Sequence, residues 1–378
     1  MTLKAEQIER IVVRGANWVG DAVMTVPALR ELRRLLPRAH ITLATRAWAK
    51  DIFDGADFID DILTIDEGSH GVRSFFRQVK AWRARRFDLA ILLPNSIESA
   101  LVAFAARVPT RVGYATQSRG EFLTHPLEVP PWRNTRHEIF YYLNIANELA
   151  RLLGADASTG ELASQTDERA PQFALEVSDA RRAEARAILE RHGADISRPL
   201  VALCPGSTNS RAKRWQTERF AALADRLIEE AGATVMLIGA SEELDVTNEV
   251  LASMRQRPVV LTGETSLAES TAILSLVDLL VTNDTGPAHL ASALGRPTLV
   301  IFGPTNPVTT RPFAACAEII RRPPDCAPCM LRDCPIDHRC MTAISVDDVF
   351  ARCVALLDQA VSAVETSREV GIEAEAVR

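Results

Sequence analysis

Short apolar runs alternate with longer segments in which apolar residues recur at helical spacing. Ile11, Val12 and Val13 indicate a strand, and Leu29 and Leu32 belong to the helix that follows it. The same alternation continues toward the middle of the chain. Strands are expected over residues 40–45, 60–66 and 87–95, and helices over 47–53, 72–86 and 96–107. This order of elements predicts a parallel sheet with helices on both faces.

For two helices in the first 200 residues, the sequence also predicts a buried face or a capping residue. In the helix over 72–86, the apolar positions Phe75, Phe76, Val79 and Trp82 are expected to share one face. After a polar segment, residues 163–172, Ser178 is expected to cap a helix that ends at His192. The alternation then restarts, with strands expected over 199–207, 233–240, 278–284 and 297–303, and helices around 220–227, 267–276 and 287–294.

The fold class is therefore α/β, with two doubly wound domains. The expected domains are residues 1–175 and 176–360, and residues 361–378 are expected to form a flexible tail. A length of 378 residues suits two domains of roughly 150–200 residues each. Ligands of such domains bind beyond the carboxyl ends of the strands.

The charge balance restricts the partners. The chain has 43 basic and 49 acidic residues, a net charge of −6, which argues against broad nucleic-acid binding. The first ten residues lack the apolar segment of a signal peptide, and no run approaches the ~20 apolar residues of a membrane span. The protein is expected in the cytoplasm, where its seven cysteines stay reduced.

The loop after the first strand, GANWVGD, ends in a carboxylate. Asp21 stands where a phosphate-binding loop of the G-x-x-x-x-G-K-[ST] type has its lysine, so that type of loop is excluded. From its position alone, Asp21 serves either as a catalytic base or as a favourable charge at a helix N-terminus.

Two loops of the second half combine the groups that bind phosphate. PGSTNSRAKRW offers hydroxyls and three cations, although it could also be a solvated basic loop. NDTGPAH places Asp284 or Thr285 as a cap before Pro287, and Gly286 allows close approach of a ligand to the backbone. The helix amides could then bind phosphate, while His289 is either a ligand contact or a core histidine.

The motifs GANWVGD, LPNS, CPGSTNSRAKRW, VTNDTGPAHLASALGRP and FGPTNP, in this order over about residues 10–310, resemble the ADP-heptose:lipopolysaccharide heptosyltransferases of glycosyltransferase family 9. The resemblance implies the GT-B fold, with an acceptor-binding first domain and an ADP-heptose-binding second domain. The tryptophan of GANWVGD, the LPNS loop and AKRW are most similar to the members that add the second heptose of the inner core.

The resemblance also implies roles for residues. Asp21 would be the general base of an inverting transfer, and Lys213 would stabilise the leaving diphosphate without a metal or other cofactor. The donor site would comprise Ser207, Thr208, Lys213, Glu242 or Glu243, Asp284, Thr285, Gly286 and His289.

The implied acceptor is a lipid-linked, phosphorylated glycan, so basic side chains are expected in the first domain. Arg119 is the first candidate for acceptor binding, and Arg111 and Asn95 are the next two. Further basic candidates in or near loops are Arg46, Arg133 and Arg136. Such an acceptor implies peripheral contact with the inner face of the inner membrane. No lipidation motif or strongly amphipathic basic helix indicates tight anchoring.

A cysteine cluster near the C-terminus is the remaining motif. Cys326, Cys329, Cys334 and Cys340 could hold a structural zinc ion, with His338 nearby, but the spacings after the C-x-x-C are irregular, and redox-sensitive thiols and plain packing stay open as alternatives. Three functional alternatives also stay open: a sugar-nucleotide epimerase on the same scaffold, a silent sugar-nucleotide-binding subunit, and a family member that acts directly on Kdo-lipid A.

Overall fold

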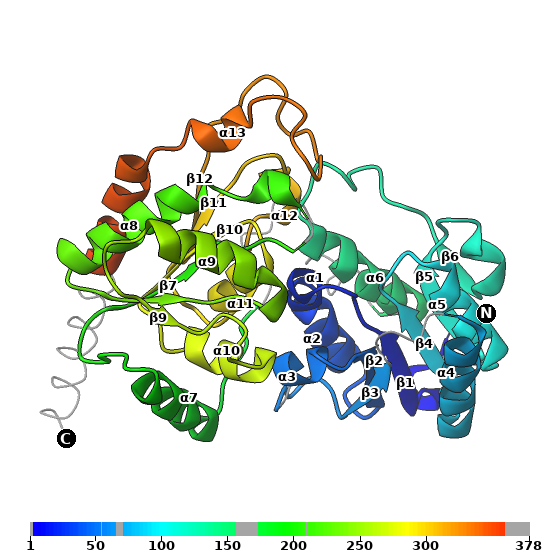
Figure 1. Ribbon diagram of the computed structural model, residues 1–378. Coiled ribbons are helices and arrows are strands. Elements are labelled where there is room, and N and C mark those ends of the chain that lie inside the picture. The colour runs from blue at the N-terminus through cyan, green and yellow to red at the C-terminus, as the bar shows by residue number, and fades with distance from the viewer. Residues whose placement is uncertain (1–2, 54, 66–70, 156–172, 209, 360–378) are drawn as a thin grey trace, which may run out of the picture. The chain divides into compact units, whose positions relative to one another are not determined.

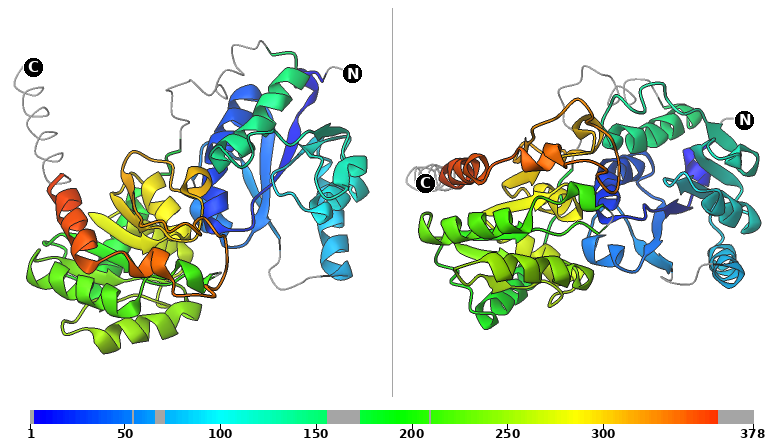
Figure 2. Two further views of the ribbon diagram at one scale, coloured as in Figure 1. Left: turned by 90° about the horizontal axis from the view of Figure 1, so that it is seen from above. Right: turned by 45° about the horizontal axis from the view of Figure 1, so that its top comes forward.

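The computed structural model describes residues 3–53, 55–65, 71–155, 173–208 and 210–359. The chain divides into two compact units, Met1–Glu176 and Val177–Arg378, and each contains a six-stranded, wholly parallel sheet (Figure 1). Helices lie on both faces of each sheet (Figure 2). The expected tail over 361–378 and the polar segment over 163–172 lie outside the described residues.

The sheet of the first unit has the strand order β3-β2-β1-β4-β5-β6. The strands are β1 (Arg10–Arg14), β2 (His40–Arg46), β3 (Asp61–Ile65), β4 (Leu89–Leu92), β5 (Thr110–Tyr114) and β6 (His125–Leu127). The helices are α1 (Val19–Met24), α2 (Val26–Leu35), α3 (Ala49–Phe53), α4 (Val72–Arg85), α5 (Ile97–Ala105) and α6 (Glu138–Leu152), with the 3₁₀ turns η1 (Ala5–Gln7) and η2 (Arg119–Phe122). Strand β4 is buried along its length, as expected of a parallel strand covered on both faces.

The second unit repeats this plan with the order β12-β11-β10-β7-β8-β9. Its strands are β7 (Leu200–Cys204), β8 (Thr234–Leu237), β9 (Val259–Val260), β10 (Leu279–Asn283), β11 (Thr298–Ile301) and β12 (Ala317–Ile320). Its helices are α7 (Asp179–Arg191), α8 (Thr217–Glu229), α9 (Leu244–Ser253), α10 (Leu267–Leu274), α11 (Gly286–Ala293), α12 (Pro307–Thr310), α13 (Arg339–Thr342) and a last helix over 346–359, with the 3₁₀ turns η5 (Arg211–Lys213) and η6 (Ser241–Glu243).

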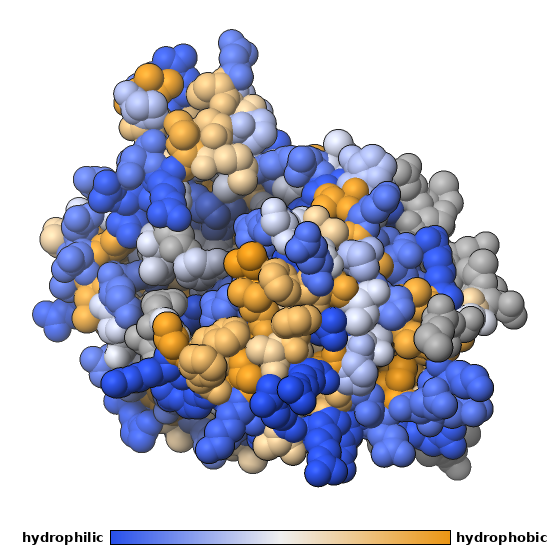
Figure 3. All heavy atoms as spheres, turned by 90° about the vertical axis from the view of Figure 1, so that its right-hand side faces the viewer, coloured by the Kyte–Doolittle hydropathy of each residue, from blue (hydrophilic) through white to orange (hydrophobic). Residues whose placement is uncertain are grey.

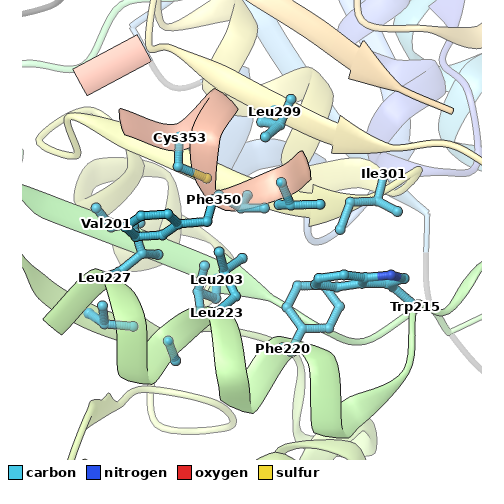
Figure 4. Close-up of a cluster of buried hydrophobic side chains, with 14 of the residues drawn as sticks. Val201, Leu203, Trp215, Phe220, Leu223, Leu227, Leu299, Ile301, Phe350 and Cys353 are labelled. Carbon is cyan, nitrogen blue, oxygen red and sulfur yellow. The ribbon is translucent and has the colours of Figure 1, made fainter. Parts of the chain in front are cut away.

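The core of the second unit joins its sheet to the last helix. Trp215 packs edge-on against Phe220, with 5.2 Å between the ring centroids. Phe350 and Cys353 of the last helix point into the same cluster as Leu203 of β7 (Figure 4). The last helix is thus part of the folded unit, because its apolar side chains are buried against the strands.

Most local expectations about the helices are confirmed. Ser96 Oγ accepts a hydrogen bond from the Ser99 amide, and Ser178 Oγ accepts one from the Arg181 amide, so both serines are N-caps. The helix after β1 is interrupted at Thr25, since Pro27 has no N–H to continue the hydrogen-bond ladder. Phe76 does not join the packed face of α4; its exposed fraction is 62%.

The strand order places the candidate loops at two switch points. In the first unit, β1 and β4 are neighbours from which the chain winds in opposite directions, and the loops with Asp21 and Asn95 follow these strands. In the second unit, β7 and β10 are likewise neighbours from which the chain winds in opposite directions. The loops with Ser207 and Asp284 follow these two strands. Such switch points are where open α/β sheets bind ligands. Within the described ranges, every helix is too short or too polar to span a bilayer.

Candidate active site

The loop after β7 is shaped by one buried carboxylate. Glu243 Oε2 accepts a hydrogen bond of 3.1 Å from the Ala240 amide, and Oε1 accepts one of 3.4 Å from Thr208 Oγ1. A Cβ atom on Gly206 would lie 2.3 Å from the Glu243 carboxyl carbon, so any larger residue there would displace this carboxylate. Burial raises the pKa of Glu243, and the Ala240 amide and Arg214 oppose that shift. Glu243 therefore lines this switch point.

Glu242 is placed differently from its neighbour. Its side chain is exposed, and its Oε2 accepts a hydrogen bond of 3.1 Å from Ser241 Oγ. Of the two glutamates that the sequence left as alternatives, only Glu243 contacts the loop that carries Ser207 and Thr208.

Lys213 is held at the end of β10 by Asp284. Its Nζ atom lies 3.0 Å from Asp284 Oδ2 and donates to the Asp284 carbonyl oxygen at 3.2 Å. Asp284 Oδ2 also accepts a hydrogen bond of 2.6 Å from Thr305 Oγ1. The expectation that Asp284 caps the following helix is therefore wrong, because its carboxylate is engaged by Lys213 and Thr305. The Lys213 side chain keeps an exposed fraction of 26%, so it can still face a ligand.

The N-terminus of α11 lacks a side-chain cap. Thr285 occupies the N-cap position, but its hydroxyl lies 3.1 Å from Thr282 Oγ1 and 3.3 Å from the Asn283 carbonyl oxygen. No side-chain oxygen among the described residues caps the helix that starts at Gly286. Uncapped amides at a helix N-terminus can bind a phosphate oxygen.

His289 lies on α11 beside this group. Burial lowers its pKa to about 4, an effect that Asp284 opposes, so the imidazole is neutral at pH 7. Its Nδ1 atom is buried and has no hydrogen-bond partner among the described residues. A core histidine with satisfied hydrogen bonds, one of the two alternatives from the sequence, would not leave a buried nitrogen unpaired.

In the first unit, Asp21 lies in the first turn of α1, close to α6. It is partly exposed, and its charge contributes to the raised pKa of Glu138 and of Tyr142, after the larger effect of burial. The preceding loop is tightly packed, since a Cβ atom on Gly15 would lie 2.9 Å from Thr45 Oγ1. Arg14, at the end of β1, donates a hydrogen bond of 3.2 Å to Asn17 Oδ1, and this bond restrains the loop.

Asn95 is held by two side chains at the carboxyl end of β4. It donates to Tyr141 Oη at 3.0 Å and accepts from Arg119 Nη2 at 3.4 Å. Arg133 lies over the Tyr141 ring at 3.8 Å and forms a bidentate ion pair with Glu138. The sequence pattern did not single out Tyr141 or Glu138, because Glu138 starts α6 as an ordinary first-turn acid and Tyr141 lies among the apolar residues that α6 buries.

The guanidinium groups of Arg119 and Arg111, two arginines that were expected to contact the acceptor, donate to carbonyl oxygens of the first unit. Arg119 has an exposed fraction of 0% and donates to the carbonyl oxygens of Tyr114, Pro94 and Ser96, so it braces the loop around Asn95. Arg111 pairs in register with Ala90 near the start of β4, at the opposite end of the sheet from Asn95. Its guanidinium donates to the Phe122 carbonyl oxygen at 2.6 Å.

The cysteine-rich segment packs on the Lys213 loop. The Ala212 amide donates to the Arg332 carbonyl oxygen at 2.9 Å, and His338 Nε2 donates to the Ala212 carbonyl oxygen at 2.6 Å. Burial raises the pKa of the Cys340 thiol to about 11, with smaller contributions from Cys329, Cys334 and Cys326. In the ranges that the structure describes, no group of three or more His, Cys, Asp or Glu side chains is placed to hold a metal ion. A structural zinc ion, one of the three explanations that the sequence offered for this cluster, stays a prediction.

The chain is similar in sequence to a family of known enzymes. The profile described as glycosyltransferase family 9 (heptosyltransferase) matches residues 73–339. Lipopolysaccharide heptosyltransferase 2 of Escherichia coli K12 is 30% identical over 321 residues, which cover 82% of this chain and 88% of that protein.

Solved structures agree with the profile match. That of E. coli ADP-heptose lipopolysaccharide heptosyltransferase II has a TM-score of 0.76 at 27% identity and covers 93% of this chain and 99% of the other. An E. coli heptosyltransferase solved with ADP has a TM-score of 0.66 at 16% identity, with coverage of 92% and 100%, and so shares the fold. The expected GT-B fold is confirmed, and the chain belongs to glycosyltransferase family 9, the heptosyltransferases.

Proposed function

We propose that this enzyme transfers heptose from ADP-heptose to the first heptose of the lipopolysaccharide inner core, with inversion of the anomeric carbon. The observation that carries the proposal is the group formed by Lys213, Asp284 and Glu243 at the switch point of the second unit. The likeness to E. coli lipopolysaccharide heptosyltransferase 2 supports the choice of donor and acceptor.

The donor is proposed to bind through its diphosphate and its ribose. Lys213, the hydroxyls of Ser207 and Thr208, and the amides of α11 from Gly286 onward supply donors and positive charge for the phosphates. Glu243 accepts hydrogen bonds from the ribose hydroxyls, and Asp284 positions Lys213. His289 Nδ1 faces the donor as a neutral hydrogen-bonding group.

The reaction proposed for this site needs one carboxylate as base. As the bond between the anomeric carbon and the diphosphate oxygen breaks, the acceptor hydroxyl oxygen attacks from the opposite face and its proton passes to Asp21. ADP leaves with the bonding electrons, and Lys213 and the helix amides stabilise its growing charge. The side chains named here supply this stabilisation, so the proposal includes no metal or other cofactor.

Asn95 is proposed to hold an acceptor hydroxyl near Asp21, since Asn95 is anchored by Tyr141 and Arg119. The acceptor is lipid-linked, which places the reaction at the inner face of the inner membrane with the enzyme in the cytoplasm.

The deciding experiment incubates ADP-heptose with purified acceptors that carry no heptose or one heptose. Product on the one-heptose acceptor supports the proposal, whereas product on the heptose-free acceptor alone assigns the enzyme to the Kdo-lipid A step. A change of configuration in ADP-heptose without any acceptor would point to an epimerase. Binding of ADP-heptose without turnover on either acceptor would point to a silent binding subunit.

A further inference from the structure

The first unit exposes apolar side chains on two neighbouring helices, α4 and α5. The exposed fractions are 71% for Val72, 62% for Phe76, 41% for Ile97 and 49% for Phe104. Ile97, partly exposed Leu101 and Phe104 are spaced i, i+4 and i+7, so they form one stripe along α5. Exposed apolar residues that gather in a patch, rather than singly, mark an interaction surface.

The two helices present this surface together. Gln78 of α4 donates to Glu98 Oε1 of α5 at 3.5 Å, and Arg83 of α4 donates to the Ala105 carbonyl oxygen at 2.5 Å. On the face of the first unit that Figure 3 presents, hydrophobic residues gather and hydrophilic residues border them. We call Val72, Phe76, Ile97, Leu101 and Phe104, with the cations next to them, the α4–α5 surface.

The cations of this surface are concentrated on α4. This helix contains Arg73, Arg77, Lys80, Arg83 and Arg85 and no acidic residue, although the whole chain has a net charge of −6. Arg73, Arg77 and Lys80 are exposed and spaced i, i+4 and i+7, next to Val72 and Phe76. Among the described residues, the exposed acids nearest to α4 in the chain are Asp60 before it and Glu98 after it, and Asp60 forms an ion pair with Arg33. The surface therefore combines apolar side chains with a strong local positive charge.

The apolar and cationic side chains of the α4–α5 surface together indicate which kind of partner binds there. Apolar tips bordered by lysine and arginine are the features of an interfacial helix that binds an anionic lipid surface. A second copy of the chain fits less well, because a two-fold contact centred on α4 would bring the cations of this helix close to those of the partner's α4. A nucleic acid would use the cations but leave the apolar stripe of α5 uncovered.

We propose that the α4–α5 surface docks on a bilayer that contains anionic phospholipid, with Phe76 and Phe104 entering the headgroup region. Helices in a doubly wound unit run antiparallel to the strands, so α4 and α5 both begin at the carboxyl edge of the sheet. Ile97 is only two residues after Asn95 in the chain. Phe76 lies near this edge, whereas Phe104 lies in the last turn of α5, under the Arg111 guanidinium at 5.5 Å from its ring centroid. The α4–α5 surface therefore runs along the length of both helices.

The test measures binding of the full-length protein to vesicles by sedimentation at fixed ionic strength. Vesicles contain phosphatidylcholine alone or phosphatidylcholine with phosphatidylglycerol at a 7:3 ratio. The wild-type protein is expected to bind the anionic vesicles at least tenfold more strongly. The triple variant Arg73→Gln, Arg77→Gln, Lys80→Gln is expected to lose about 100-fold in binding, since each cation near such a surface contributes about fivefold.

A matched control removes the same charge elsewhere. Arg186→Gln, Arg191→Gln, Arg257→Gln changes three exposed arginines of the second unit and is expected to bind as the wild type does. A second variant, Phe76→Ser with Phe104→Ser, keeps every charge and is expected to lose about tenfold. Its control is Val308→Ser with Ile336→Ser, at two exposed apolar positions of the second unit.

Activity assays distinguish a failure of the docking proposal from a failure of the proposed transfer reaction. With a water-soluble acceptor fragment, the α4 variants are expected to keep wild-type turnover, and only transfer to vesicle-embedded acceptor is slowed. Equal loss of binding in the triple variant and its charge-matched control would overturn the docking proposal, as would absence of binding to the anionic vesicles. A wild-type dimer that Phe76→Ser with Phe104→Ser dissociates would also overturn it, since the surface would then be an interface between copies.

Discussion

Lys213 Nζ lies 3.0 Å from Asp284 Oδ2, which joins the turn after β7 to the end of β10 across 71 residues of sequence. The Asp284 carboxylate is nearly buried, whereas the ammonium group is partly exposed. Asp284 therefore fixes the direction of a cation that is free to meet a further anion on its open side. This is the arrangement that a leaving diphosphate needs, because the charge is placed before the reaction begins.

Lys213→Ala is expected to lower kcat by about 10²–10³-fold, because a preorganised donor to the leaving group is removed. ADP affinity, measured by calorimetry, should fall in the same variant. The matched control is Arg211→Ala, which removes an exposed cation two residues away that pairs with exposed Asp333. If Arg211→Ala weakens ADP binding as much as Lys213→Ala does, the general positive charge of the loop, and not the position of Lys213, is responsible.

Asp21→Asn is expected to lower kcat by about 10²–10⁴-fold while leaving ADP affinity unchanged, because the amide cannot take the acceptor proton. Single-turnover transfer and ADP calorimetry measure the two effects separately. Asp57→Asn is the control, since Asp57 is an exposed carboxylate of the same unit that pairs with Arg30. Retention of more than a tenth of wild-type turnover by Asp21→Asn would rule out Asp21 as the base.

Gly206→Ala is expected to weaken donor binding by about tenfold. The new methyl group would overlap the Glu243 carboxylate, which must then leave its hydrogen bonds to Ala240 and Thr208. Gly120→Ala is the control, because the nearest atom to its Cβ would lie at an ordinary 3.5 Å. Calorimetry with ADP and with ADP-heptose checks the result, and unchanged affinity would mean that Glu243 has no part in donor binding.

His289 is expected to make folding sensitive to acid. Its pKa is about 4 in the folded protein and about 6.5 when unfolded, so between these values the unfolded state binds more protons. The free energy of unfolding should therefore fall as the pH drops, by about 2 kcal/mol between pH 7.5 and 5 from this residue. Urea unfolding at both pH values should show a smaller drop in His289→Gln, and an equal drop would contradict the assignment.

Arg119→Met is expected to destabilise the first unit by about 2–4 kcal/mol, because several buried carbonyl oxygens lose their donor. Arg107→Met, at an exposed arginine, should change the free energy of unfolding by less than about 0.5 kcal/mol. Denaturant unfolding measures both. A stable Arg119→Met variant that fails only with acceptor would mean that Arg119 contacts the acceptor after all.

The sequence by itself determined the alternation of strands and helices, the two parallel sheets and the loops at their carboxyl ends. These features follow from periodicity and from caps such as Ser96 and Ser178, which act between residues a few positions apart. The family motifs added the expected roles of Asp21 and Lys213.

Only the tertiary structure decided which polar groups meet. It turned Glu243 inward and Glu242 outward, buried Arg119 beneath Asn95, paired Lys213 with Asp284 and left Phe76 on the surface. No local pattern encodes these contacts, because the order of strands in a sheet brings together residues that are far apart in the chain. The sequence around an arginine near a loop, such as Arg119, does not show whether its guanidinium faces water or donates to buried carbonyl oxygens.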